Sequence, residues 1–191
     1  FKVAPDLGRV AVLTGEGRAF CSGQDLGDRS AGAMIDLERT LRDEYVPMLR
    51  AIIDCPIPTI AAVNGPAAGA GANLALVADV VMASTDAYFV QAFARIGLIP
   101  DAGGTWFLPR QMGLARAMGA SLFTDKITAQ QAADWGMIYE VAEAVVFSAH
   151  WRGRALQLAT GPTQTYAHIK TALRASFDNS LEQQLELEAK L

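Results

Sequence analysis

The sequence of 191 residues is long enough for one domain with a sizeable core, and 51% of its residues are apolar. Its acidic and basic residues are dispersed and leave a net charge of −4, which argues against a nucleic-acid partner. Two cysteines, Cys21 and Cys55, provide neither a disulfide framework nor a metal-binding spacing, as is typical of a reducing cytoplasm. No apolar run approaches the ~18 residues that span a bilayer.

Taken in chain order, residues 1–9 lead into a buried strand at 10–14, and a helix is predicted over 35–53. Pro47 must lie near a kink or break in this helix, because proline has no amide hydrogen to donate. Further strands are predicted at 58–63, 79–83 and 88–91, with a helix at 72–78 between the first two of them.

Helices dominate the rest of the chain, with Thr128 and Ser180 as predicted N-caps. The helices are expected at 105–111, 115–122, 129–135, 145–159, 163–177 and 181–191. Strands that alternate with helices, followed by helices alone, indicate an α/β core with a helical C-terminal part.

A glycine-rich turn at 64–73 joins the strand at 58–63 to its helix and carries Gly65, Gly69 and Gly71. A turn with so few side chains lets another molecule approach the backbone, and the first helical turn aims its N–H groups at that molecule. These donors and the helix dipole stabilise an oxyanion. Close packing of the turn against neighbouring backbone explains the same glycines without a ligand.

Two other segments accompany this turn: 17–26, after the first strand, and 97–105, which contains Asp101. In order and spacing, the three motifs resemble those of the enoyl-CoA hydratase/isomerase (crotonase) superfamily over nearly the whole chain. The resemblance implies an α/β crotonase-like ββα spiral core at 1–140 and a C-terminal helical region at 141–191. It also implies that full members are longer, so we expect residues to be missing at both ends and near 29–34, and an upstream targeting segment is compatible with the start at Phe1.

The resemblance implies a CoA thioester whose carbonyl oxygen sits between two backbone N–H groups, those of Gln24 and Ala70. It places the acid/base carboxylate of some superfamily isomerases at Asp101. The substrate-binding residues that it implies are Ser22, Gly23, Asp25, Leu26, Gly69, Gly71, Asn73, Phe93 and Trp106. It implies no metal and no separate cofactor, since coenzyme A is part of the substrate.

Asp101 also has a purely structural interpretation. Asp is a favoured helix N-cap, and the segment Pro100–Gly103 is common turn chemistry. If Asp101 is instead buried beside an apolar acyl chain, desolvation raises its pKa toward a range useful for proton transfer.

The sequence departs from the family at the two glutamates with which hydratases hold water. The matching positions are Asn73 and Phe93, and neither can transfer a proton. We therefore expect slow or absent hydration and an isomerase that shuttles a proton with one carboxylate. The motifs, together with 135–138, are most similar to the ring-epoxyphenylacetyl-CoA isomerases, some of which also move double bonds in enoyl-CoAs.

Two other functions stay open. One is a non-catalytic acyl-CoA-binding member of the family, and the other is a hydratase with unusual acid/base groups. The resemblance further implies a homotrimer or hexamer built partly by the C-terminal helices. We expect an acyl-CoA partner, no nucleic acid, no membrane and a cytoplasmic location.

Overall fold

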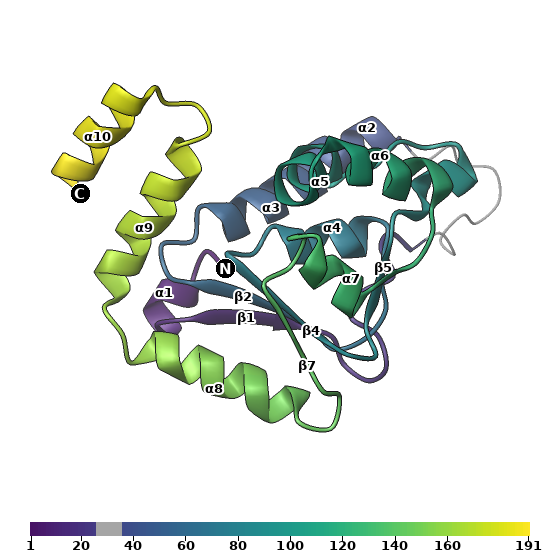
Figure 1. Ribbon diagram of the computed structural model, residues 1–191, viewed down its shortest axis with the longest axis horizontal. Coiled ribbons are helices and arrows are strands. Elements are labelled where there is room, and N and C mark those ends of the chain that lie inside the picture. Colours follow the sequence, from purple (N-terminus) through teal and green to yellow (C-terminus); the bar gives the residue numbers. More distant parts are fainter. Residues whose placement is uncertain (26–35) are drawn as a thin grey trace.

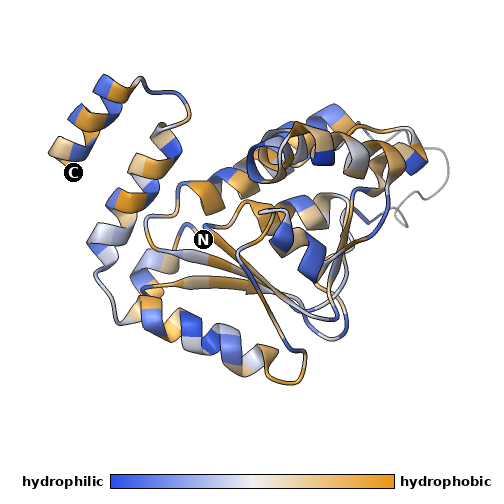
Figure 2. Ribbon diagram, viewed as in Figure 1, coloured by the Kyte–Doolittle hydropathy of each residue, from blue (hydrophilic) through white to orange (hydrophobic). Residues whose placement is uncertain are grey.

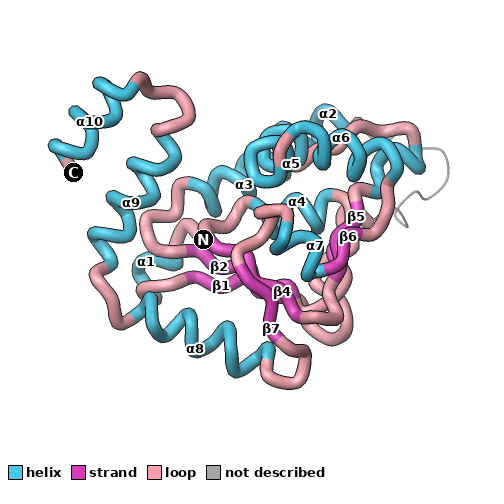
Figure 3. The backbone as a smooth tube through the Cα atoms, viewed as in Figure 1, coloured by secondary structure: helices cyan, strands magenta, loops and turns pink. Residues whose placement is uncertain are grey.

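The computed structural model describes residues 1–25 and 36–191, and within them the chain builds two small sheets (Figures 1 and 3). The larger sheet is parallel, with the order β1-β2-β4-β7. Its strands are β1 (Ala11–Thr14), β2 (Thr59–Val63), β4 (Val80–Ser84) and β7 (Glu140–Ala142). In the smaller sheet, β5 (Tyr88–Val90) lies between a parallel β3 (Ala67–Ala68) and an antiparallel β6 (Ile127–Thr128).

Both faces of the larger sheet are buried, as a parallel sheet requires. Successive residues of β2 point to opposite faces: Ile60 and Ala62 pack under α8, whereas Ala61 and Val63 belong to the main core. Figure 1 shows α8 along one face and α4 and α7 over the other, and Figure 2 shows the apolar strands between these helices.

The helices follow the predicted order with small shifts at their ends. They are α1 (Ala4–Leu7), α2 (Leu37–Thr40), the π-helix η1 (Leu41–Tyr45), α3 (Val46–Ile53), α4 (Ala70–Leu76), the 3₁₀-helix η2 (Ala92–Ile96), α5 (Gly104–Met112), α6 (Leu114–Phe123), α7 (Ala129–Asp134), α8 (Phe147–Ala159), α9 (Thr163–Ala175) and α10 (Leu181–Lys190). Both predicted N-caps are confirmed, because Thr128 and Ser180 each form a capping box. Some short elements were not predicted: α1 within 1–9, β3 within the glycine turn, η2, and the strands β6 and β7.

The helix predicted over 35–53 is described from Leu37 onward and changes its winding before Pro47. The Val46 N–H donates to the Leu41 carbonyl five residues back, which is the hydrogen bond of a π-turn. Pro47 cannot donate in the normal ladder and its ring crowds the preceding turn, so the wider π-turn accommodates it without ending the helix. The predicted break is therefore local. Ile35 lies outside the described residues.

The C-terminal helices form an arm. In Figure 1, α9 runs beside the body and α10 continues beyond it at the C-terminal end. The arm is tied to the core by Asp79, whose carboxylate oxygens lie 2.7 Å from both Lys170 Nζ and Arg174 Nη2. None of the helices in the described part of the chain combines the length and apolarity needed to cross a bilayer.

Candidate active site

The first two glycine motifs lie against each other. Cys21 and Ala67 form an isolated parallel bridge, and the Ala68 N–H donates to the Cys21 carbonyl at 2.9 Å. Gly23 adopts a φ of 89°, and a Cβ added there would lie 3.3 Å from the Ala70 nitrogen. Gly23 immediately precedes Gln24, so the fold brings the segments of both predicted backbone donors together, as the sequence motifs indicated.

Helix α4 begins at Ala70, two residues earlier than predicted, because Gly69 turns the chain at its N-cap with a φ of 54°. The N–H groups of the first turn have no acceptor inside the helix. A Cβ added at Gly71 would overlap the Cys21 carbonyl, so this position requires glycine for the two turns to meet. Ala70 itself is buried, and its N–H belongs to the first turn of α4.

Asp101 lies in a turn of unusual backbone just before α5. Ala102 and Gly103 both have left-handed backbone, with φ values of 47° and 83°. Gly103 is the N-cap of α5, so the alternative role of Asp101 as that N-cap is wrong. Holding a non-glycine residue in this conformation costs about 1–3 kcal/mol, and such strain clusters at functional sites.

The Asp101 carboxyl is partly buried. Within the described part of the chain, its Oδ1 is shielded from solvent and has no hydrogen-bond partner. Burial raises its pKa above the ordinary value of 3.8, and a hydrogen bond from its own backbone N–H lowers the pKa in part. A carboxyl that holds its proton more tightly is a better base once ionised.

Asn73 holds the Asp101 turn from inside. Its side chain is fully buried, and Nδ2 donates to the Asp101 carbonyl at 2.8 Å. Its Oδ1 accepts from Gln91 Nε2 at 2.9 Å. Both ends of the amide are thus used within the protein. The geometry gives Asn73 a role in fixing Asp101, whereas its predicted contact with substrate stays a prediction.

Phe93, on η2, is buried, and a Cβ added at Gly69 would lie 3.8 Å from its ring. It belongs to a buried cluster that includes Ala70, itself a predicted donor, and Ala102, which follows the predicted acid Asp101. The resemblance matches this position to a hydratase glutamate, and here the side chain is an apolar ring, 6% exposed. This packing fits an apolar acyl group better than an ordered water.

The other predicted substrate-binding residues are spread around this centre. Ser22, Gln24 and Asp25 are exposed at the mouth of the first turn, and Leu26 lies outside the described residues. Trp106 is half-exposed, with the Arg110 guanidinium 3.3 Å from the centre of its ring. It lines a cavity of about 900 Å³ between α3, α5 and α9, whose lining includes neither Asp101 nor either predicted donor.

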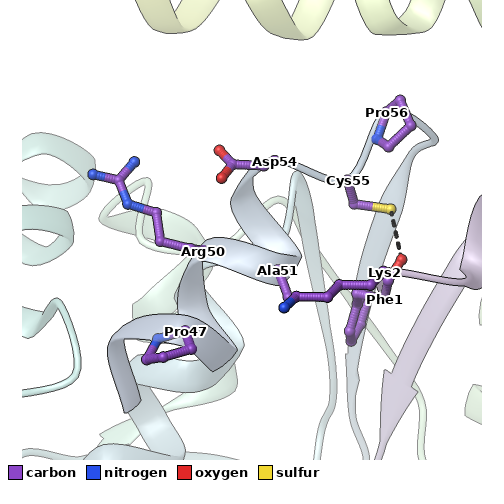
Figure 4. A pocket seen from close by; sticks show the side chains of 8 residues that line it. All are labelled: Phe1, Lys2, Pro47, Arg50, Ala51, Asp54, Cys55 and Pro56. Atoms are coloured by element: carbon purple, nitrogen blue, oxygen red, sulfur yellow. Dashed lines mark hydrogen bonds between the residues drawn. The ribbon is translucent and has the colours of Figure 1, made fainter. Parts of the chain in front are cut away.

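A smaller cavity of about 290 Å³ lies beside the first residues of the chain (Figure 4). It is lined by residues 1–2 and by α3 and the loop after it, with the Cys55 thiol directed at the Phe1 carbonyl. None of the predicted site residues lines it, so it has no part in the candidate active site.

Tyr45 was missed by the sequence motifs. Its hydroxyl donates to Gln24 Oε1 at 2.8 Å, and its ring packs against the cluster of Ala70, Phe93 and Ala102. In sequence it is one more apolar position of a helical stripe. Pro47, two residues on, was the available signal that the helix is distorted there.

Among residues 1–25 and 36–191, no group of His, Cys, Asp and Glu side chains is arranged to hold a metal ion.

Comparison with known proteins bears on this arrangement. A model of the enoyl-CoA hydratase/isomerase family matches residues 4–191. The chain is 60% identical over 183 residues to a Rhodobacter capsulatus protein named "Probable enoyl-CoA hydratase", covering 96% of this chain and 71% of that protein. It is 47% identical over 186 residues to the 1,2-epoxyphenylacetyl-CoA isomerase of Escherichia coli, with the same coverage of both chains.

Among solved structures, the enoyl-CoA hydratase of Bacillus anthracis superposes with a TM-score of 0.89 at 29% identity, over 95% of this chain and 70% of that chain. The predicted crotonase-like fold is thereby confirmed. The chain belongs to the enoyl-CoA hydratase/isomerase family, whose members act on acyl-CoA substrates.

Proposed function

We propose that the protein is an acyl-CoA isomerase that moves a double bond, or rearranges a ring epoxide, with Asp101 as its acid/base group. The observation that carries the proposal is the Asp101 carboxyl, whose buried Oδ1 is unpaired within the described residues. Asn73 and Phe93, at the positions of the hydratase glutamates, cannot activate water. The likeness to the 1,2-epoxyphenylacetyl-CoA isomerase of Escherichia coli supports the same reaction class.

The chemistry follows from three groups. Asp101 takes a proton from the α-carbon of a 3-enoyl thioester or the γ-carbon of a 2-enoyl thioester. The electron pair of the broken C–H bond forms a new C=C bond, and the π pair of the thioester carbonyl moves onto its oxygen to give an enolate. The N–H groups of Gln24 and Ala70 stabilise the enolate oxygen. Asp101 then gives the proton to another carbon of the dienolate. The enolate oxygen re-forms the carbonyl, and the electron pairs shift so that the C=C bond is left at its new position.

This reaction conserves atoms and electrons within the substrate. It therefore needs no redox cofactor, and coenzyme A enters as part of the thioester. A homotrimer or hexamer in the cytoplasm fits the proposal, but neither the assembly nor the location is needed for the chemistry.

The second candidate is enoyl-CoA hydration, which is favoured by the name of the 60% identical relative. It requires a group that holds and activates water. The Asn73 amide already donates to the Asp101 carbonyl and accepts from Gln91 Nε2, and Phe93 is packed in an apolar cluster. A hydratase would thus need acid/base groups other than the two expected glutamates.

The test is to incubate the purified protein with 2-enoyl-, 3-enoyl- and aryl-CoA thioesters and to identify the products by NMR and mass spectrometry. In H₂O we expect products of unchanged mass. In D₂O we expect them to gain deuterium wherever the proton held by Asp101 exchanges with solvent before it is returned to the substrate. Asp101→Asn should lower turnover by a factor of about 100 or more and leave acyl-CoA binding nearly unchanged. Asp86→Asn, in the exposed turn after β4, is the matched control. Efficient hydration, or near-normal isomerisation by Asp101→Asn, would overturn the proposal; binding without turnover would favour a non-catalytic acyl-CoA-binding protein.

A further inference from the structure

Tyr45 stands where the helix from Leu37 to Ile53 meets the first glycine motif. It is the last residue of η1, and the π-turn that ends at Val46 widens the helix at this point. Widening by one residue rotates the side chains on one side of the turn relative to those on the other. The direction of the Tyr45 side chain is thus set by the local distortion ahead of Pro47.

The Tyr45 side chain hydrogen-bonds the Gln24 turn and packs against the buried cluster that includes Ala70 and Ala102. Its hydroxyl hydrogen-bonds Gln24 Oε1 at 2.8 Å, across 21 residues of sequence. Its ring packs against the cluster that contains Ala70 and Ala102. One residue therefore links the turn of one predicted donor to the neighbourhood of the other donor and of Asp101.

The phenol stays a hydrogen-bond donor under physiological conditions. Burial raises the pKa of Tyr45 above its ordinary value, and the nearby carboxylates of Asp101 and Glu44 raise the pKa further. A neutral phenol donates its proton to an amide oxygen such as Gln24 Oε1 without competing for the proton that Asp101 must move.

The Gln24 backbone needs such support. Gln24 follows Gly23, whose φ of 89° belongs to a backbone with few steric restraints, and its own side chain is exposed at the mouth of the turn. An N–H that must meet a developing oxyanion works only at the correct distance and angle. A misplacement of about 1 Å costs roughly a hundredfold in rate.

We propose that Tyr45 is a positioning residue: its hydrogen bond to the Gln24 side chain fixes the turn that presents the Gln24 backbone N–H to the thioester oxygen. This inference rests on the proposed function, because it assumes that the Gln24 N–H contacts the carbonyl. It assigns Tyr45 no proton transfer and no contact with substrate.

The first experiment is a double-mutant cycle in turnover. Tyr45→Phe keeps the ring and removes the hydroxyl, whereas Gln24→Leu removes the acceptor and keeps the backbone N–H. We expect each single variant to lower kcat by roughly tenfold to a hundredfold, with KM changed by less than about threefold. The double variant should be no slower than the slower single variant, because both remove the same hydrogen bond. Tyr139→Phe, an exposed tyrosine beside Arg154, is the control and should retain full activity.

The second experiment reads the oxyanion contact without turnover. Benzoyl-CoA labelled with ¹³C at its carbonyl has no proton on the carbon next to the thioester and serves as an unreactive probe. We expect the carbonyl stretching frequency to fall on binding to the unaltered protein, and to fall clearly less on binding to Tyr45→Phe. The same difference should appear in an Asp101→Asn background, because Asp101 takes no part in polarising the carbonyl.

The outcomes separate the two proposals. If the frequency falls equally in the protein and in Tyr45→Phe, or if the two variants are additive in kcat, the positioning role is wrong while the isomerase proposal stands. If the frequency does not fall even in the unaltered protein, the backbone donors are misassigned and the role of Tyr45 fails with them. If the frequency behaves as expected but no thioester is isomerised, the positioning role stands and the isomerase proposal fails. Equal melting temperatures of the protein and Tyr45→Phe rule out a loss of fold as the cause.

Discussion

At the scale of single residues, protonation of Asp101 links activity to stability. The carboxyl works as a base only when ionised, yet burial disfavours the ionised form and raises its pKa above 3.8. The protein thus gives up some stability at neutral pH to keep a reactive carboxylate. Such a trade is common where activity needs a group that the fold alone would not choose.

The pKa shift of Asp101 predicts opposite pH trends for rate and stability. We expect kcat/KM to rise with pH through an acidic limb whose midpoint lies above 3.8. Because the folded pKa is raised, the protonated carboxyl favours the native state; this contribution is present below the ordinary pKa and is lost as the pH rises through the folded pKa. Asp101→Asn should therefore raise the melting temperature near neutral pH, and the gain should shrink in acid.

Thermal melts of Asp101→Asn and Asp86→Asn across this pH range provide the measurement. Asp86→Asn should follow the unaltered protein throughout. A gain in melting temperature for Asp101→Asn that is the same in acid as at neutral pH would contradict the assignment, as would an acidic limb that this variant leaves in place.

Sequence reasoning reached some residues of the site and not others for a physical reason. Gln24, Ala70 and Asp101 lie in glycine-marked turns that are visible in sequence, and the family resemblance assigned their roles. Tyr45 and Gln91 act through partners 21 and 18 residues away. Contacts of this kind depend on how η1 and β5 are placed in space, which no local pattern encodes.

At the scale of elements, the strands β1, β2, β4 and β5 and the long helices were predicted from apolar runs and helical patterning, whereas the three-residue strand β7 of the larger sheet was missed. The two-residue strands β3 and β6 were not predicted either, since so few residues show no period. The π-turn was also missed: Pro47 indicated a break, but tertiary contacts of α3 decide that the helix continues through it.

The attachment of α9 depends on Asp79, which lies between α4 and β4. This carboxylate, 14% exposed, faces Lys170 and Arg174 and also accepts from the Thr59 N–H at 2.8 Å. Removing one partner of a buried pair leaves the other charge uncompensated. We expect Asp79→Asn to lower the free energy of unfolding by about 3 kcal/mol and to speed hydrogen exchange in α9.

Urea denaturation and hydrogen exchange of Asp79→Asn measure these two effects. Glu186→Gln is the control, since its pair with Lys190 on α10 is more than 60% exposed on both sides. It should change stability by less than about 0.5 kcal/mol. Equal effects of the two substitutions would mean that the Asp79 cluster does not fasten α9.

At the scale of the whole molecule, the sheets and their covering helices form a body from which the α9–α10 arm extends (Figure 1). The sequence indicated a helical C-terminal part but not where it lies, because the charges that dock it come from residues about 100 positions apart. Both faces of the larger sheet are covered within the described residues, whereas much of the arm's apolar surface is not.

The last prediction concerns what covers that surface. Large apolar side chains of the arm are exposed in the described chain, and they include Ile169, Leu173, Phe177, Leu181 and Leu185. A helix with such a face is stabilised when the face is buried, and the family resemblance implies a trimer or a dimer of trimers. We therefore propose that the arm packs against further copies of the chain.

Light scattering coupled to size-exclusion chromatography should give the mass of three or six chains. Leu181→Glu with Leu185→Glu should shift the protein toward monomers, because each introduces a charge into the packed face, whereas the exposed-site control Glu188→Gln should not. If the unaltered protein has the mass of a monomer, or if both leucine substitutions leave the mass of the assembly unchanged, the arm has another role.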